Sequence, residues 1–200
     1  MTEDFIPAYV ISTGTLPKNL GGLQFVPEVL AYVPFYKTNV ILTMDLPTLS
    51  DPHDRLKFLG LKTGDKIRCS RNNDKEDVWT LYDSPVYNEL KQQYKKETEK
   101  ESRENALCCY VLASALIIND SHRGIEFVRN VLAYNPIKDV EIVLKEPFFM
   151  YPDERIMFFN LDRGDKISCA DGENPVIRKY ITYEKEIKQH KKAVKDRSGK

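Results

Sequence analysis

The stretch Gly22-Leu-Gln-Phe-Val-Pro-Glu-Val-Leu-Ala-Tyr-Val-Pro34 recurs 102 residues later as Gly124-Ile-Glu-Phe-Val-Arg-Asn-Val-Leu-Ala-Tyr-Asn-Pro136. A second stretch, Leu61-Lys-Thr-Gly-Asp-Lys-Ile-Arg-Cys69, recurs 100 residues later as Leu161-Asp-Arg-Gly-Asp-Lys-Ile-Ser-Cys169. Agreement in blocks that keep their order predicts an internal duplication. A period near 100 residues is typical of a whole domain and is too long for a solenoid repeat.

The duplication predicts two similar domains with a charged segment after each. The first domain covers residues 1–85 and the second covers residues 106–182. The intervening residues 86–105 lack Gly and Pro and place opposite charges at helical spacings, which predicts a charged helical linker. Residues 183–200 follow the second domain in the equivalent place, and we expect a basic C-terminal helix or tail there.

Each unit contains five short segments that are rich in β-branched and aromatic residues and are separated by Gly, Pro and Asn or Asp. The expected strands are 7–15, 22–33, 39–45, 65–70 and 77–82, and then 107–118, 124–135, 139–145, 165–170 and 176–182. The long connection between the third and fourth strands is expected to hold a short helical turn or an extra strand. This pattern predicts a mainly β fold, with two tandem five-stranded barrels of the OB type and a charged helix after each.

The repeated Gly64-Asp65 and Gly164-Asp165 each precede an alternating segment, Lys-Ile-x-Cys. Such a pair predicts a turn that feeds a strand. Ile67 and Cys69 then share one face of that strand, and we expect this face to be buried. The two aspartates are accordingly interpreted as turn residues before any acid–base role.

Three segments of the first unit resemble motifs of the cold-shock domain family. They are Gly22-Leu-Gln-Phe-Val-Pro, Asn39-Val-Ile-Leu and Leu59-Gly-Leu-Lys-Thr-Gly-Asp-Lys-Ile. The resemblance spans most of each unit and implies an OB-type barrel whose second and third strands stack single-stranded bases on aromatic side chains. The Phe of the second-strand motif corresponds to Phe25 and Phe127. The third strands, Asn39-Val-Ile-Leu-Thr and Asp139-Val-Glu-Ile-Val, lack the Phe and His of the family pattern.

Candidate nucleic-acid-binding residues are the recurring aromatic and cationic side chains of the strands, together with lysines of the tail. Aromatic rings stack on bases and lysines contact phosphates. The alternative roles are core packing for the aromatic residues and a solvated strand or helix surface for the lysines. The candidates are Phe25, Tyr32, Phe35, Lys66, Phe127, Tyr134, Lys166, Lys191 and Lys192.

The charge distribution leaves two partner classes open. Both units are slightly acidic, with 9 Lys and Arg against 11 Asp and Glu in each, whereas residues 183–200 have 7 against 3. The acidic units favour a protein-interaction adaptor that has lost nucleic-acid binding. The second-strand motif and the basic tail favour a binder of single-stranded RNA or DNA. We carry both hypotheses forward.

Other function classes find little support in the sequence. No Ser/His/Asp, Cys/His or phosphate-loop pattern is present, and none of the three histidines recurs in the other unit. The four cysteines form no C-x-x-C motif, which is typical of neither a zinc ribbon nor a disulfide framework. We therefore expect a non-enzymatic protein without cofactor or metal. Without an apolar run of about 18 residues, we expect neither membrane insertion nor secretion, and a cytoplasmic or nuclear location.

Overall fold

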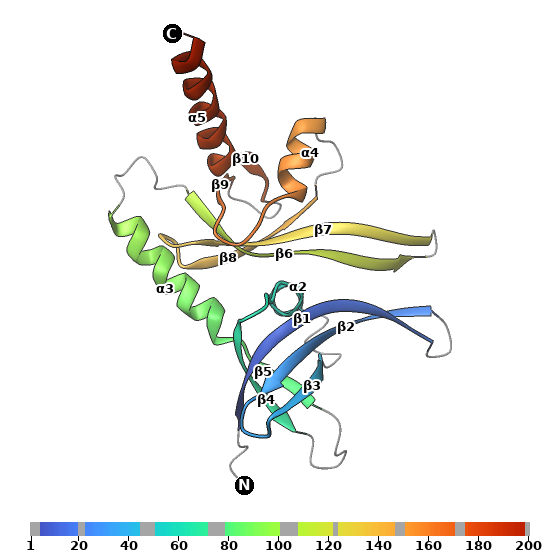
Figure 1. Cartoon of the computed structure of the whole chain (residues 1–200). Coiled ribbons are helices and arrows are strands. Elements are labelled where there is room, and N and C mark those ends of the chain that lie inside the picture. The colour runs from blue at the N-terminus through green and yellow to red at the C-terminus, as the bar shows by residue number, and fades with distance from the viewer. Residues whose placement is uncertain are drawn as a thin grey trace.

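The computed structural model describes residues 5–19, 23–44, 51–71, 79–100, 108–121, 124–146, 151–170 and 175–198. The first half contains β1 (Ile6–Asn19), β2 (Leu23–Val33), β3 (Thr38–Thr43), α2 (Pro52–Leu59), β4 (Lys66–Arg71), β5 (Trp79–Asp83) and then α3 (Pro85–Lys100). The second half contains β6 (Cys108–Ser121), β7 (Gly124–Asn135), β8 (Val140–Lys145), α4 (Pro152–Phe159), β9 (Lys166–Cys169), β10 (Ile177–Lys179) and then α5 (Ile181–Ser198) (Figure 1). The predicted mainly β class, with a helix after each set of strands, is confirmed.

The strands of the first half close into a barrel in the order β1-β2-β3-β5-β4. Closure comes from a short parallel pairing of β3 with β5, in which Leu42 lies opposite Trp79, and from antiparallel pairing of β4 with β1. A closed five-stranded barrel of this kind fits an OB-like small barrel. The long connection contains helix α2, because Pro52 occupies the first turn and the Asp51 carboxylate caps the helix by accepting hydrogen bonds from two backbone N–H groups.

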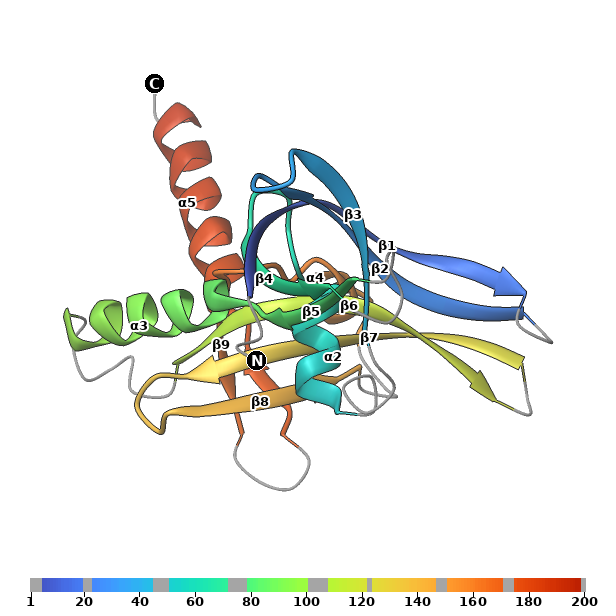
Figure 2. The ribbon, with the colours of Figure 1, turned by 90° about the horizontal axis from the view of Figure 1, so that it is seen from below.

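The strands of the second half form a curled five-stranded sheet in the order β10-β9-β6-β7-β8. The spatial order of its strands corresponds to that of the barrel. Strand β6 lies between β7 and β9, just as β1 lies between β2 and β4. Among the described residues, β8 and β10 do not pair with each other, so this sheet stays open where the barrel is closed. Both halves send a long two-stranded hairpin, β1–β2 and β6–β7, out of the body in the same direction (Figure 2).

The pairing registers show which residues of the two halves are equivalent. Tyr9 lies opposite Tyr32 on β1 and β2, and Tyr110 lies opposite Tyr134 on β6 and β7. Asn39 lies opposite Tyr32, whereas Glu141 lies opposite Tyr134. Asn39 therefore corresponds to Glu141, and the sequence alignment that set Asn39 against Asp139 is wrong by two residues.

The repeated Gly-Asp turn fixes β1 to the start of β4. Gly64 has a φ of +91°, a conformation that L side chains rarely adopt, and its N–H donates to the Val10 carbonyl at 2.8 Å. The Asp65 carboxylate accepts a hydrogen bond from the Lys62 N–H at 2.8 Å. The equivalent turn at Gly164 has the same bonds, so the predicted turn role is confirmed. Cys69 lies in the barrel core as expected.

One hydrophobic cluster extends from the barrel into the second half across helix α2, which lies between the barrel and the second sheet (Figures 1 and 2). A second cluster fills the other side of the second sheet beneath α4. Leu56 of α2 is fully buried and belongs to the same cluster as Leu112 and Leu132 of the second sheet. Gly60, after α2, lies so close to Ala113 that a Cβ atom at position 60 would clash with the Ala113 side chain. The close approach of the halves therefore requires a glycine at position 60.

Arg163 of the second half joins the two Gly-Asp turns. Its guanidinium donates to both carboxylate oxygens of Asp65, at 2.7 and 2.8 Å, and to the Gly60 carbonyl at 2.8 Å. It also lies over the Tyr87 ring, 5.5 Å from the ring centre. Burial disfavours the charged guanidinium, but the contacts with Asp65 and Tyr87 together outweigh it and raise the pKa of Arg163. The sequence analysis did not identify Arg163, because the first half has Thr63 at this place.

Candidate nucleic-acid interface

A row of exposed side chains crosses the outer surface of the barrel. Strand pairing places Tyr9 of β1 between Tyr32 of β2 and Lys66 of β4. Side chains alternate between the two faces of a strand, and the neighbours Ala8 and Val10 are buried in the core. Tyr9 is 43% exposed and Tyr32 is 38% exposed. Directly opposed residues on antiparallel strands lie close enough for their side chains to form one surface.

Aliphatic side chains extend this surface on both sides. Ile11 follows Tyr9 at a β-bulge of β1, and Ile41 of β3 lies opposite Leu30 in the next row. Both isoleucines are exposed. Exposed apolar side chains that are contiguous mark an interaction site more often than scattered ones do. We call the surface formed by Tyr9, Ile11, Tyr32 and Ile41 the tyrosine platform.

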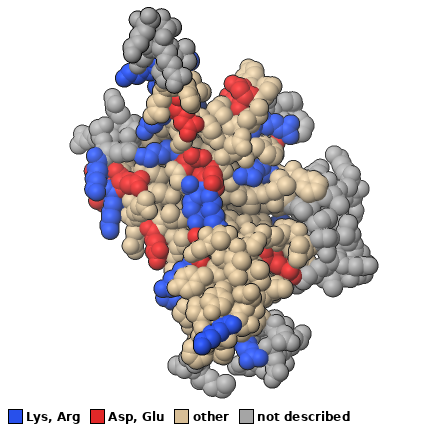
Figure 3. All heavy atoms as spheres, in the orientation of Figure 1, with Lys and Arg blue, Asp and Glu red and all other residues tan. Residues whose placement is uncertain are grey.

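The charge around the platform is positive, although the first unit as a whole is slightly acidic. On the described parts of β1–β5 and the β2–β3 turn, every exposed charged side chain is a cation. Glu28 is buried and Asp83 is half-buried. Separate basic side chains lie on the lower part of the molecule, where the barrel is found, while acidic and basic side chains lie together near α3 (Figure 3). The cations are Lys37, Lys66, Arg68 and Arg71.

A shallow groove of about 430 Å³ continues from the platform along the seam between β3 and β5. Ile41 belongs to both surfaces, and Asn39 and Arg71 also line the groove. Tyr36 lines the groove, with its ring 5.8 Å from that of Trp79 in an edge-to-face arrangement. The groove therefore adds two aromatic rings and a cation to the platform.

In the second half the equivalent platform is covered by helix α3. Tyr110 and Tyr134 are each only 1% exposed. Tyr94 of α3 stacks on Tyr110 with ring centroids 4.3 Å apart and planes 12° apart. The Lys166 ammonium lies 4.9 Å from the centre of the Tyr110 ring. The prediction that Tyr134 binds a ligand is therefore wrong, because the helix after the first barrel occupies the face where a ligand would lie.

Charged contacts hold the helices of the first half over the second sheet. Glu141 of β8 accepts hydrogen bonds from Lys57 of α2 at 2.8 Å and from Lys91 of α3 at 2.9 Å. Burial opposes ionisation of this carboxyl, but the two lysine hydrogen bonds outweigh that effect, so the pKa of Glu141 is lowered. Glu141 occupies the place that Asn39 has beside the open platform.

The sequence candidates fall into three groups in the structure. Tyr32 lies on the platform, Lys66 borders it, and Phe35 is an exposed ring in the β2–β3 turn whose edge meets Tyr36. Lys166 lies over the covered Tyr110. The other candidates lie elsewhere: Phe127 is exposed on the β6–β7 hairpin, Lys191 and Lys192 are exposed on α5, and the side chain of Phe25 lies outside the described residues.

Tyr9, Ile41 and Trp79 lie at the platform or the groove but are not among the residues predicted from the sequence. Tyr9 had a usable signal, because it recurs as Tyr110 in the second unit. Trp79 had none, since it borders the groove only through the closure of β3 on β5, which no local pattern predicts.

Two searches of the described residues found no further kind of site. None of the described residues gathers into a group of three or more His, Cys, Asp or Glu that could hold a metal ion. Within the same residues, no helix has the length and apolar character needed to cross a membrane.

Comparisons with known proteins add one distant match. No family model matches the chain, and no curated protein matches it in sequence. Among solved structures, a murine DNA-binding protein in complex with double-stranded DNA matches with a TM-score of 0.25 and 9% sequence identity. The match covers 87% of this chain and 92% of the murine chain. A match this distant assigns neither fold nor function to this chain.

Proposed function

We propose that this protein binds single-stranded RNA or DNA on the tyrosine platform of its first barrel. The observation that carries the proposal is the exposed cross-strand pair of Tyr9 and Tyr32 beside Lys66. Every base has a planar face, so stacking on an aromatic side chain tolerates any sequence and contributes about 1–3 kcal/mol per base. A core role for these two rings is inconsistent with their exposure.

The second half supports the choice of a planar ligand. Tyr110, the equivalent of Tyr9, holds the Tyr94 ring in a stacked arrangement at 4.3 Å. A lysine at the place of Lys66, namely Lys166, completes that arrangement. A base stacked on Tyr9 would meet the same combination of an aromatic face and a cation.

The surrounding cations suit the sugar–phosphate backbone. Lys66 and Arg68 flank β1 on the β4 side, and Arg71 lies in the groove on the β5 side. Bases on the platform would leave their phosphates facing these residues. Contacts of this kind contribute affinity without sequence preference. The proposed protein is therefore a non-enzymatic binder with little sequence discrimination.

One observation favours the alternative function, a protein-interaction adaptor. The equivalent platform of the second half is filled by an amphipathic helix, α3, through Tyr94 and Lys91. A helix from another protein would fit the open platform in the same way. Two observations favour nucleic acid: the exposed charged side chains on the described parts of the barrel strands are cations, and the groove beside the platform is aromatic.

Fluorescence polarisation of labelled single-stranded RNA and DNA oligonucleotides tests the proposal, with titrations at low and moderate salt. The substitutions Tyr9→Ala and Tyr32→Ala are each expected to weaken binding about tenfold, because each removes one stacking face worth about 1–3 kcal/mol. Tyr151→Ala is the matched control, since Tyr151 is an exposed tyrosine of the second half. A chain truncated after residue 182 separates binding by the platform from binding by the basic tail. If the intact protein at micromolar concentration and low salt binds neither oligonucleotide, the proposal is refuted.

A further inference from the structure

Helices α2 and α4 are equivalent, but their outer surfaces differ in exposure. Phe58 of α2 and Phe158 of α4 are each 1% exposed, and each lies in the core of its own half. Leu56 of α2 is 0% exposed because the second sheet covers it, whereas its equivalent Ile156 is 63% exposed. The outer surface of α4 thus exposes an apolar side chain at the place where α2 buries one, together with the charged Asp153 and Arg155.

The two sheets show the complementary difference. Tyr110, Leu112 and Tyr134 of the second sheet are buried beneath α2 and α3. Their equivalents, Tyr9, Ile11 and Tyr32, form the exposed platform. Each half therefore has one sheet surface and one helix surface that can pair. Among the described residues one such pairing is made inside the chain, and the first platform and the second helix surface are exposed.

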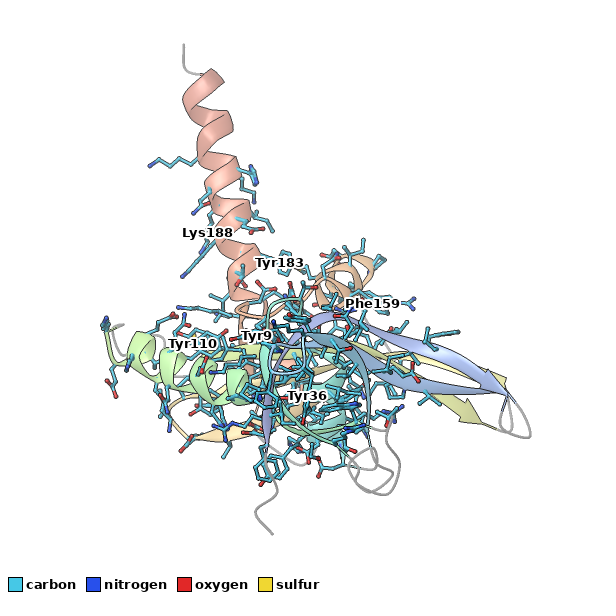
Figure 4. The ribbon with its side chains drawn as sticks, turned by 60° about the horizontal axis from the view of Figure 1, so that its bottom comes forward. Tyr9, Tyr36, Tyr110, Phe159, Tyr183 and Lys188 are labelled. Atoms are coloured by element: carbon cyan, nitrogen blue, oxygen red, sulfur yellow. The ribbon has the colours of Figure 1, made fainter. Side chains whose placement is uncertain are left out.

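We propose that copies of this protein associate head to tail, with α4 and the adjoining part of α5 of one copy covering the tyrosine platform of the next. The occupant follows from the duplication, since the chain already makes this pairing once between its own halves. The open helix surface lies beside the base of α5, where Tyr183 is found, and α5 then extends away from the body past Lys188 (Figure 4).

Both exposed surfaces lack the charged residues that pair in the internal contact. In the internal contact, Lys57 and Lys91 pair with Glu141. The platform has Asn39 at the place of Glu141, and the second helix surface has Met157 at the place of Lys57. The equivalent of Lys91 on α5 is Ile187, counted from the strand pairs Cys69–Leu81 and Cys169–Ile177. Association would therefore bury apolar side chains without leaving a charge of this group unpaired.

Two positions make the contact between copies looser than the internal one. Asn160 stands where the first half has Gly60, so the second helix surface cannot approach a sheet as closely. Its side chain is turned back onto the Ile156 carbonyl at 2.9 Å. In the internal contact, Lys95 of α3 forms an ion pair with Asp139. Lys37 takes the place of Asp139 beside the platform, so this ion pair has no counterpart between copies. We therefore expect association to depend on concentration.

Such a contact is heterologous, because each copy uses a different surface on each side. Every added copy again offers an open platform at one end and an open helix surface at the other. If the platform binds nucleic acid as proposed above, association and nucleic-acid binding exclude each other. Self-association would then regulate the access of nucleic acid to the platform.

Sedimentation velocity of the full chain from micromolar to several hundred micromolar tests the proposal with two variants. Ile41→Asp disables the platform and Ile156→Asp disables the helix surface, and both side chains are more than half exposed, so both variants are expected to fold. Wild type is expected to rise beyond twice its monomer mass. Each variant alone is expected to stay monomeric, and an equal mixture of the two is expected to form dimers. Tyr9→Asp serves as a second platform variant.

Other outcomes overturn the proposal. If Ile156→Asp alone associates as strongly as wild type, the platforms pair with each other in a symmetric dimer. If wild type stays monomeric at all concentrations, neither pairing occurs. Asn160→Gly is expected to strengthen association several-fold, because it restores the close approach. Oligonucleotide binding by the monomeric variant Ile156→Asp tests the proposed function separately. If this variant binds no oligonucleotide while the mixture of the two variants still forms dimers, nucleic-acid binding by the platform is refuted and self-association stands.

Discussion

Tyr94 of α3 stacks on Tyr110 of β6, with ring centroids 4.3 Å apart and planes 12° apart. The equivalent Tyr9 lies on the outside of the barrel and is 43% exposed. One residue type at one place in the fold therefore has two roles. In the second half, Tyr110 packs against α3, the helix that joins the halves. In the first half, Tyr9 is exposed and accessible to a partner.

Tyr94→Ala is expected to destabilise the protein by about 3–5 kcal/mol, because it removes a buried aromatic ring and leaves a cavity above Tyr110. Equilibrium unfolding in urea measures the change. Gln92→Ala is the matched control, since Gln92 is an exposed residue of the same helix, and its effect is expected to stay within about 0.5 kcal/mol. Equal effects of the two substitutions would contradict the packing of α3 on the second sheet.

Arg163→Ala is expected to cost about 3–5 kcal/mol, because it leaves the Asp65 carboxylate buried without its bidentate partner. Arg155→Ala is the control. Arg155 pairs with Glu146 at 3.3 Å but has a largely exposed side chain, and such pairs contribute about 0–1 kcal/mol. Denaturant unfolding of both variants gives the comparison. A loss at Arg163 no larger than that at Arg155 would show that the joint between the two Gly-Asp turns is not a main source of stability.

The stability of the protein is expected to fall in acid through Glu141. The folded-state pKa of this carboxyl is lowered from 4.5, so its contribution is complete above that value and is lost as pH falls through the folded-state pKa. Glu141→Gln removes the contribution at every pH. The variant should therefore be less stable than wild type at pH 7, and the difference should narrow as pH drops below about 4.5. Urea unfolding at several pH values measures this, and a difference that does not change with pH would be the contrary result.

The salt dependence of oligonucleotide binding should report the cations beside the platform. Each phosphate contact on a single strand contributes about 0.7 to the slope of log affinity against log salt. Lys66→Gln and Arg68→Gln are each expected to lower that slope by about this amount. Lys145→Gln, an exposed lysine on β8 of the second half, is expected to leave it unchanged. The same loss of slope in all three variants would place the phosphates away from the platform.

Much of the fold follows from local patterns in the sequence. The Gly64-Asp65 turn and the alternation of Ile67 and Cys69 define β4, since both features are local and recur in the second unit. The exposure of the two tyrosine pairs could not be predicted in this way. Tyr32 and Tyr134 each end the same segment, Val-Leu-Ala-Tyr, and it is the docking of α3 on the second sheet that makes one buried and leaves the other open.

The charges of the first unit are unevenly distributed over its elements. A net count over residues 1–85 mixes the strands with the rest of the first unit, including acidic positions at Asp51 and Asp54 on and before α2. The exposed charges on the described barrel strands are cationic. The described parts of the barrel strands are therefore more basic than the unit total of 9 against 11 indicates.

The most direct test of the central claim is a titration of the isotope-labelled protein with a short single-stranded oligonucleotide, followed by NMR chemical shifts. The account predicts that the largest changes lie on β1, β2 and β3 around Tyr9, Tyr32 and Ile41, and that Tyr110 and Tyr134 beneath α3 change little. Changes confined to α5 around Lys191 and Lys192, with the platform unperturbed, would contradict it.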